Sequence, residues 1–247
     1  MEIIKTKSFS LAVVTTGDKN SNKLSILMPG RLDTKDYWNF ESHAKVLAGK
    51  GFFVVAFDPP GTWESPGGIE LCTVTNYIKA VNELIEYFGN KPTLLVGHSR
   101  GGATAALVAA SNLLVKGMVL LMASYSASSA PPDEIIARGF NLDYRDLPPG
   151  QSKSKEQKEF RLPLNYRKDG EQYNSAQALK NCSTPKLLVY ATYDEFRSSE
   201  TVEDIFRILP EPKMLKKFDC KHDYRYYPEV VAEVNKGIEI FVDKFVN

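Results

Sequence analysis

The sequence predicts an α/β fold in which a mostly parallel central sheet is flanked by helices. Short, nearly continuous apolar runs alternate with amphipathic segments of helical spacing along most of the chain. The apolar runs lack the alternating polar residues of a sheet with one face in water, so both faces are expected to be buried. A chain of 247 residues fits within one large domain.

The first elements are expected to be a hairpin, a helix and a buried strand. Residues 8–30 carry two strand-like segments, FSLAVV and LSILMPG, on either side of the polar turn TGDKNSN. Residues 34–51 then place apolar side chains at helical spacing and stop at Gly49 and Gly51. The run GFFVVAFD that follows is typical of a strand buried on both faces.

The same alternation continues to the end of the chain. The expected helices cover residues 74–90, 100–114, 202–209 and 230–246, and the expected strands cover residues 91–99, 115–124, 184–192 and 214–219. Because helices separate successive strands, the sheet is expected to be parallel apart from the first hairpin.

The pattern is interrupted between residues 124 and 181. This segment contains two Pro-Pro pairs and the charged stretch QSKSKEQKEF, and its best strand pair is EFRLPLNY with a turn near residues 168–170. A loop of this length without structure is unusual in a compact domain. The sequence therefore predicts a small cap over residues 124–181, inserted into a core formed by residues 1–123 and 182–247.

Charge and cysteine content narrow the class of partner. Lys and Arg total 31 against 30 Asp and Glu, and this balance favours a small-molecule partner over nucleic acid or an anionic membrane. Three widely spaced cysteines, Cys72, Cys182 and Cys220, fit neither a disulfide framework nor a zinc cluster. We expect a cytoplasmic protein, with no secretion signal and no membrane-spanning segment. The oligomeric state is left open.

The motif GHSRG at residues 97–101 indicates a nucleophile. It lies between the apolar strand TLLV and the small-residue helix GGATAALVAA, where a sharp turn lifts a serine hydroxyl above the sheet edge. Small neighbours relieve the crowding of such a turn. A glycine-rich turn that only packs tightly would not require the serine, so Ser99 is the predicted nucleophile.

A serine nucleophile requires a base, and the chain has three histidines. His98 is adjacent to Ser99 in sequence and cannot readily fold back onto its hydroxyl, while His43 lies in the first amphipathic helix. His222 follows the last predicted strand, and the order serine, acid, histidine suits this architecture. We therefore predict His222 as the base.

The base requires an acid that holds its ring. Asp194 follows the buried strand KLLVYAT at the carboxyl edge of the sheet and is the preferred candidate. Glu195 and Asp133 are the alternatives that remain open. Asp219 and Asp223 are expected to cap or solvate their loop.

Two backbone amides are expected to form the oxyanion hole. One is the amide of Arg100, directly after the nucleophile, and the other is the amide of Arg31 in the turn SILMPGRLDT. The side chain of Arg31 is a candidate for binding a substrate anion, although an intramolecular pair with Asp33 or Asp58 is the favoured alternative. Four aromatic residues near strand ends are candidates for lining the pocket or for the core: Trp63, Tyr125, Tyr193 and Tyr224.

With these residues placed, the chain resembles the α/β-hydrolase superfamily, and within it the small-lid carboxylesterases that include cinnamoyl and feruloyl esterases. PGRLDTKD is similar to the oxyanion turn, GHSRGG to the nucleophile elbow, YATYDEF to the acid loop and DCKHDY to the histidine loop. The resemblance implies Ser99, Asp194 and His222 as the triad and the segment near residues 124–180 as the lid. The sequence departs from it at Pro29, where the family commonly has histidine, and in the acid loop.

These observations predict a serine esterase that needs no cofactor and acts on a small or medium acyl group. A thioesterase or small peptidase would use the same triad, and a weakly catalytic ligand-binding protein is a further alternative. A metal-dependent hydrolase is disfavoured by three scattered histidines, and no glycine pattern for a nucleotide cofactor is present. The sequence does not specify the substrate.

Overall fold

The computed structural model describes residues 1–246 and contains an eight-stranded sheet in the order β1-β2-β4-β3-β5-β6-β9-β10. β1 (Glu2–Lys5) and β2 (Ser10–Thr16) form its antiparallel edge. The other six strands run parallel to one another. They are β3 (Leu24–Met28), β4 (Phe53–Phe57), β5 (Thr93–His98), β6 (Val115–Leu121), β9 (Lys186–Ala191) and β10 (Lys213–Phe218). The predicted mostly parallel α/β sheet is confirmed.

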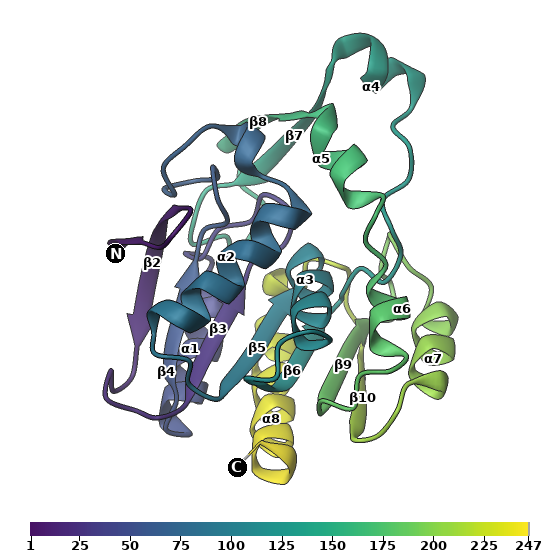
Figure 1. The fold of residues 1–247 in the computed structure, drawn as a ribbon. Coiled ribbons are helices and arrows are strands. Elements are labelled where there is room, and N and C mark those ends of the chain that lie inside the picture. Colours follow the sequence, from purple (N-terminus) through teal and green to yellow (C-terminus); the bar gives the residue numbers. More distant parts are fainter. Residues whose placement is uncertain (247) are drawn as a thin grey trace.

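Helices cover both faces of this sheet, and Figure 1 shows α2 and α3 in front of the strands. Residues of α2 (Val74–Tyr87), α3 (Arg100–Ala109), α6 (Ser175–Leu179) and α7 (Ser199–Ile208) contribute to one core layer. Residues of α1 (Trp38–Gly49) and α8 (Pro228–Phe245) contribute to the other. Leu95 of β5 points into the first layer, and its neighbours Leu94 and Val96 point into the second. Burying such side chains on both faces, at about 1.5–3 kcal/mol each, explains why these strands read as continuous apolar runs.

The first strands do not pair as the sequence predicts. β2 and β3 were expected to form a hairpin, but β4 lies between them. β2 pairs with β1 and β4, whereas β3 pairs in parallel with β4 and β5. All five residues of β3 are buried, so this strand is satisfied only in the interior of the sheet.

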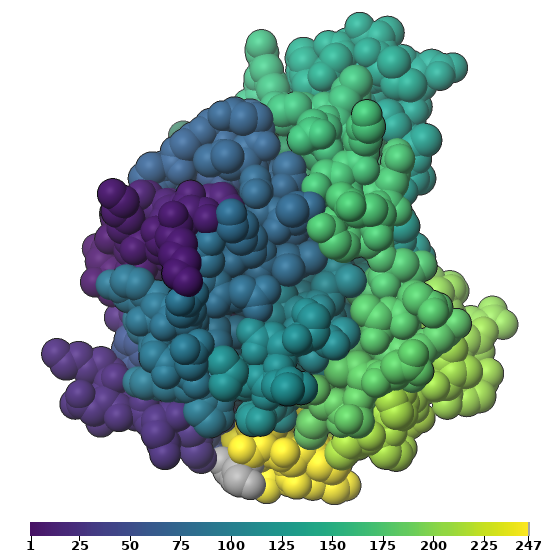
Figure 2. Space-filling view, in the orientation of Figure 1, coloured from purple at the N-terminus to yellow at the C-terminus, as the bar shows by residue number. Residues whose placement is uncertain are grey.

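A cap rises above the carboxyl ends of the parallel strands and forms a separate lobe in Figures 1 and 2. It contains α4 (Asp133–Arg138), the antiparallel pair β7 (Phe140–Asp146) and β8 (Gln157–Pro163), and α5 (Leu164–Gly170). The expected strand pair within EFRLPLNY is wrong, because EFRLP ends β8 and LNY begins α5. The partner of β8 is instead the preceding segment FNLDYRD.

The cap is narrower than the predicted 124–181. Tyr125 and Leu179 belong to the core layer in front of the sheet, and α6 packs against α3. The two ends of the cap meet at a neck: Oγ of Ser175 donates to the carbonyl oxygen of Ser124 at 2.6 Å, and the amide of Ala176 donates to that of Tyr125 at 3.0 Å. The inserted lobe is therefore residues 126–174.

Within residues 1–246, no helix combines the length and apolar character that crossing a membrane requires.

Candidate active site

The turn between β5 and α3 holds Ser99 in a backbone conformation that L residues rarely adopt, with φ 51° and ψ −112°. A Cβ on Gly97 would lie 2.4 Å from the carbonyl carbon of Gly101, and a Cβ on Gly101 would lie 2.1 Å from the carbonyl oxygen of Met28. Both glycines of GHSRG are therefore required by close backbone approach. This is the geometry of a nucleophile elbow, in which strain holds the serine at the sheet edge.

Ser99, His222 and Asp194 form a continuous hydrogen-bonded chain. Nε2 of His222 lies 2.9 Å from Oγ of Ser99, and Nδ1 lies 2.8 Å from Oδ2 of Asp194. These residues follow β5, β10 and β9, three strands whose carboxyl ends share one edge of the sheet. Because the carboxylate accepts from Nδ1, Nε2 is left to accept the serine proton. The structure thus brings together the three residues predicted as the triad.

Of the three candidate acids, Asp194 is the one that contacts the ring. Glu195 instead accepts a hydrogen bond from the backbone amide of His222 at 3.1 Å, and Asp133 begins α4 in the cap. Burial raises the pKa of the Asp194 carboxyl, but the hydrogen bond and charge of His222, the hydrogen bond from the Phe196 amide and the charge of Arg197 together lower it more, so the net pKa lies below its ordinary value. Asp194 is therefore ionised at neutral pH.

The rings of the other two histidines bond to groups other than the hydroxyl of Ser99. His98 is buried, and its Nδ1 lies 3.2 Å from Oδ2 of Asp33. Burial raises the pKa of Asp33, but His98 and neighbouring arginines lower it more, so the carboxyl is ionised. His43 is fully buried behind the site and bonds to Asn235 and to the hydroxyl of Tyr224.

The sequence predicts that the backbone amides of Arg31 and Arg100 form an oxyanion hole, and both residues lie at the wall of the same cavity as Ser99. Arg31 follows the turn after β3, and Arg100 is the first residue of α3. Among the hydrogen bonds of residues 1–246, none uses either amide. A helix N-terminus also adds the positive end of its dipole at Arg100.

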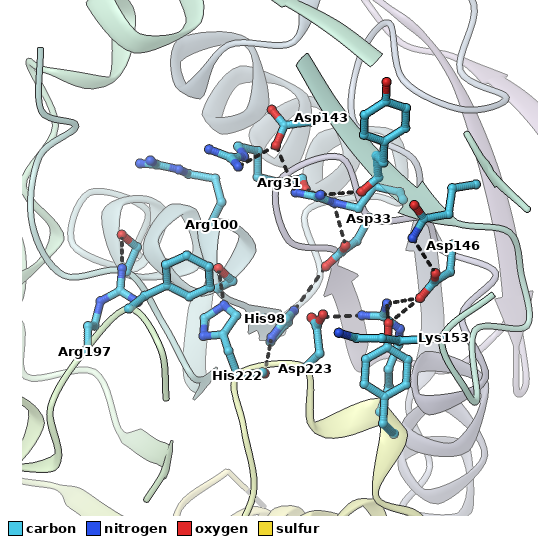
Figure 3. A pocket seen from close by; sticks show the side chains of 18 residues that line it. Arg31, Asp33, His98, Arg100, Asp143, Asp146, Lys153, Arg197, His222 and Asp223 are labelled. Atoms are coloured by element: carbon cyan, nitrogen blue, oxygen red, sulfur yellow. Dashed lines mark hydrogen bonds and ion pairs between the residues drawn. The ribbon is translucent and has the colours of Figure 1, made fainter. Parts of the chain in front are cut away.

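Ser99 and His222 line a cavity of about 490 Å³, bounded by core loops and by the cap. Figure 3 shows its 18 lining side chains, most of which are charged or polar. Six are cationic and four are carboxylates: Arg31, Arg100, Arg145, Lys153, Arg197 and Arg225, with Asp33, Asp143, Asp146 and Asp223. Ligand sites are usually lined mainly by apolar and aromatic groups, so this lining favours a polar ligand.

Each carboxylate of the cavity is paired with an arginine. The pairs are Arg31–Asp143 at 2.8 Å, Arg145–Asp33 at 3.4 Å, Arg225–Asp146 at 2.9 Å and Arg225–Asp223 at 2.9 Å. Three of these carboxylate groups, those of Asp33, Asp143 and Asp146, belong to pairs that join the core to β7 of the cap. The expectation that Arg31 forms an intramolecular pair is confirmed, but its partner is Asp143 of the cap rather than Asp33 or Asp58.

Of the two roles left open for the four aromatic residues, lining the cavity is wrong for all four, and the core is confirmed for Tyr125 and Tyr224. Trp63 packs on Phe160, and its Nε1 donates to the carbonyl oxygen of Leu32. Tyr125 and Tyr224 are buried in the core layers, and Tyr193 is exposed. None of these four residues is among those that line the cavity. Position near a strand end does not specify whether an aromatic side chain turns toward the cavity, the core or solvent.

Sequence reasoning missed two groups of cavity residues. Phe196 and Arg197 follow Asp194 in the acid loop, and the ring of Phe196 lies edge-on to His222 with centroids 4.7 Å apart. Their place in a loop at the carboxyl edge of the sheet was the available signal. Asp143 and Arg145 lie two residues apart on β7, and nothing in the sequence places that strand over Ser99.

One acidic cluster has the geometry of a cation site. Carboxylate oxygens of Asp36, Asp58 and Glu64 lie within 4.8 Å of one another. The buried ammonium of Lys35 is bonded to all three, at 2.6, 3.1 and 2.5 Å. Lys35 therefore supplies the positive charge there, and the cluster is an internal ion-pair network.

Comparison with known proteins adds the family. The sequence matches the family described as alpha/beta hydrolase fold over residues 26–162. A serine hydrolase-like protein from Dictyostelium discoideum is 29% identical over 137 residues, which are 55% of this chain but only 38% of that protein.

Solved structures of similar shape share little sequence with this chain. Est1E from Butyrivibrio proteoclasticus, solved with ferulic acid, is 18% identical with a TM-score of 0.76, and the alignment covers 100% of this chain and 99% of that one. Monoacylglycerol lipase from Paleococcus ferrophilus is 22% identical with a TM-score of 0.73, over 94% and 98% of the two chains. At these identities the likeness shows the fold.

Proposed function

Because this chain belongs to the alpha/beta hydrolase fold family, we propose that it is a serine hydrolase that cleaves an ester of a small or medium acyl group through an acyl-enzyme intermediate. The observation that carries the proposal is the hydrogen-bonded chain from Ser99 through His222 to Asp194 at the wall of a cavity. The serine hydrolase-like name of the Dictyostelium discoideum relative supports it.

The acylation step uses the three residues in order. Nε2 of His222 takes the proton of Ser99 as Oγ attacks the acyl carbon, and Asp194 stabilises the imidazolium that forms. His222 then gives this proton to the departing alkoxide. The ester bond breaks, and the acyl group remains on Ser99.

The acyl-enzyme is then hydrolysed. His222 takes a proton from water, whose oxygen attacks the acyl carbon, and the proton passes to Oγ as the acid leaves. In both steps the negative charge on the carbonyl oxygen is stabilised by the amides of Arg31 and Arg100, which have no other hydrogen-bond acceptor in residues 1–246. The scheme requires no cofactor.

The test combines a covalent probe with turnover. The purified protein is incubated with a fluorophosphonate, and p-nitrophenyl esters of increasing acyl length are assayed in parallel, with Ser99→Ala as the matched variant. We expect labelling at Ser99 and a loss of turnover of about 10⁴-fold or more in Ser99→Ala. Unchanged turnover in that variant would rule out the mechanism.

The same assay separates the rival activities. Thioesters and peptide p-nitroanilides matched in acyl length are compared with the oxygen esters by their kcat/KM ratios. A higher kcat/KM for the thioester or the anilide would reassign the reaction while keeping the triad. Tight ligand retention without labelling or turnover would indicate a binding protein instead.

A further inference from the structure

Two guanidinium groups beside the triad have no carboxylate partner. Arg100 directly follows Ser99, and Arg197 lies three residues after Asp194. Both line the cavity, as Figure 3 shows. Whereas the other three arginines of the cavity are paired with its four aspartates, neither Arg100 nor Arg197 forms an ion pair in the part of the chain that the structure describes.

Each of these side chains is only partly satisfied by the protein. Nη2 of Arg100 donates to Oγ of Ser128 at 3.2 Å, and Nη2 of Arg197 donates to Oγ of Ser124 at 2.7 Å. Within residues 1–246, Nε of Arg100 and Nη1 of Arg197 are buried and have no acceptor. A buried N–H without an acceptor is unfavourable, and more so when the group is charged.

The charges around these two groups do not balance. The cavity wall has two more cationic side chains than carboxylates. Asp194, the carboxylate whose charge raises the pKa of Arg197, is already hydrogen-bonded to His222. Burial lowers the pKa of Arg197, and the positive charge of Arg100 lowers it further, against the opposing effect of Asp194. The two arginines therefore interact as like charges across the site.

The serines hold the guanidinium groups in place without neutralising them. Ser124 accepts one N–H from Arg197, and Ser128 accepts one from Arg100. Cζ of Arg100 also lies 5.7 Å from the centroid of the Tyr166 ring. Such contacts fix the orientation of the planar guanidinium group, whose N–H donors form a fork, before a ligand binds. This reduces the conformational entropy that is lost on binding. Oxyanions match this fork because they accept two N–H groups from one arginine.

We propose that the substrate carries an anionic oxyacid group, a carboxylate or a phosphate, and that Arg100 and Arg197 bind it beside Ser99. This inference rests on the proposed ester hydrolysis and names its substrate class. The anion accepts N–H groups that the two guanidinium groups present to the cavity, and its charge offsets the excess positive charge of the cavity wall. Arg31, the cation expected from sequence to bind a substrate anion, instead anchors the cap through Asp143.

The turnover test uses pairs of esters that differ only in charge. p-Nitrophenyl hemiglutarate against p-nitrophenyl valerate tests a carboxylate on the acyl side, and 4-acetoxybenzoate against its methyl ester tests one on the leaving group. 4-Acetoxyphenyl phosphate against its dimethyl phosphate ester tests a phosphate on the leaving group. We expect kcat/KM to favour the anionic member of at least one pair by roughly tenfold or more.

Variants then attribute the preference to the two arginines. In Arg197→Gln and Arg100→Gln, the ratio of kcat/KM for the anionic over the neutral ester should fall by roughly tenfold or more, while Arg197→Lys keeps part of it because the charge remains but the fork is lost. Arg207→Gln is the matched control, because Arg207 is exposed and pairs with Asp204 on α7. A ratio that stays near one in the wild type, or that does not change in Arg197→Gln, overturns the proposal.

A binding test separates this proposal from the hydrolase proposal. Monomethyl glutarate, methyl phosphate and dimethyl glutarate are titrated into Ser99→Ala by calorimetry, so that no turnover is needed. One of the anions should bind at least tenfold more tightly than the diester, and this difference should disappear in Ser99→Ala/Arg197→Gln. Equal or absent binding of all three overturns the anion site, whatever the esterase assay gives. Anion binding without turnover would keep the site and remove the reaction. Circular dichroism checks that each variant is folded.

Discussion

Nε2 of His98 donates a hydrogen bond to the backbone carbonyl oxygen of His222, 3.2 Å away. The residue before the proposed nucleophile thus holds the loop that carries the proposed base. Its other ring nitrogen faces the carboxylate of Asp33. We therefore predict that His98 is a positioning residue that acts on Ser99 through His222.

The first prediction is that His98→Ala lowers kcat by roughly a hundredfold while changing KM little, because the imidazole of His222 is no longer held in line with Ser99. His98→Gln should recover part of the loss, since its amide can donate to the same carbonyl oxygen. Steady-state kinetics across pH and the rate of fluorophosphonate labelling measure the effect. A purely structural role would make both variants unstable but leave the kcat of the folded fraction unchanged.

The second prediction separates the adjacent carboxylates of the acid loop. Asp194→Asn should lower kcat by about 10⁴-fold, because the amide no longer favours the tautomer that leaves Nε2 free to accept. Glu195→Gln should change kcat less than about tenfold, since Glu195 hydrogen-bonds to the backbone amide of His222, not to its ring, and pairs with the exposed side chain of Lys221. Comparable losses in both variants would contradict the assignment of Asp194.

The third prediction concerns acid stability. Burial lowers the pKa of His43 to about 4, whereas an unfolded histidine titrates near 6.5. Protonation therefore favours the unfolded chain, and stability falls as the pH drops from about 6.5 toward 4, by about 3 kcal/mol in total. Carboxylates with a lowered pKa, such as Asp194, lose their stabilising contribution only as the pH falls below about 4.

Urea unfolding at pH 7.5 and pH 4.5 tests this prediction, with His43→Gln as the matched variant. A glutamine side chain does not titrate, so the difference in free energy of unfolding between the two pH values should be smaller in the variant by about 2–3 kcal/mol. The same pH dependence in both proteins would show that His43 is not responsible.

The fourth prediction concerns the attachment of the cap. Asp146 of β7 and Arg225 are 2% and 4% exposed, and their ion pair spans 2.9 Å. Asp146→Ala removes one partner of a buried pair and should lower the free energy of unfolding by about 3 kcal/mol. Glu159→Ala on the exposed face of β8 is the control, with an expected change below about 0.5 kcal/mol. Equal denaturation midpoints for the two variants would show that this pair does not hold the cap.

The sequence predicted the parallel core because its strands are buried on both faces and its helices have one apolar side. The pairing of β2 and β3 was not predictable in the same way, since strand order depends on which segments meet in the folded chain and not on local pattern. β7 was missed because its sequence does not alternate between apolar and polar residues. Two of its buried positions are Asp143 and Asp146, which form ion pairs with arginines of the core.

The same distinction applies to the candidate site: some of its residues could be predicted from local sequence pattern and others could not. Ser99, Asp194 and His222 were identifiable because each follows a predicted strand of the parallel sheet, and the carboxyl ends of parallel strands lie at one edge. The charged residues of the cap could not be identified from the sequence, because their distance from Ser99 depends on how the inserted lobe packs over the sheet. The aromatic lining was wrong for a related reason: strand ends position a residue, but packing orients its side chain.

The neck at Ser124 and Ser175 makes the cap a replaceable part of the molecule. The chain leaves the core at Ser124 and re-enters it at Ser175, and these two residues are hydrogen-bonded to each other. The strands before and after the cap, β6 and β9, are direct neighbours in the sheet. Because the cost of closing a loop grows slowly with its length, segments of different size fit between these two points. Exchange of this one lobe by recombination would give the same core a new range of substrates while the residues at the strand ends stay unaltered.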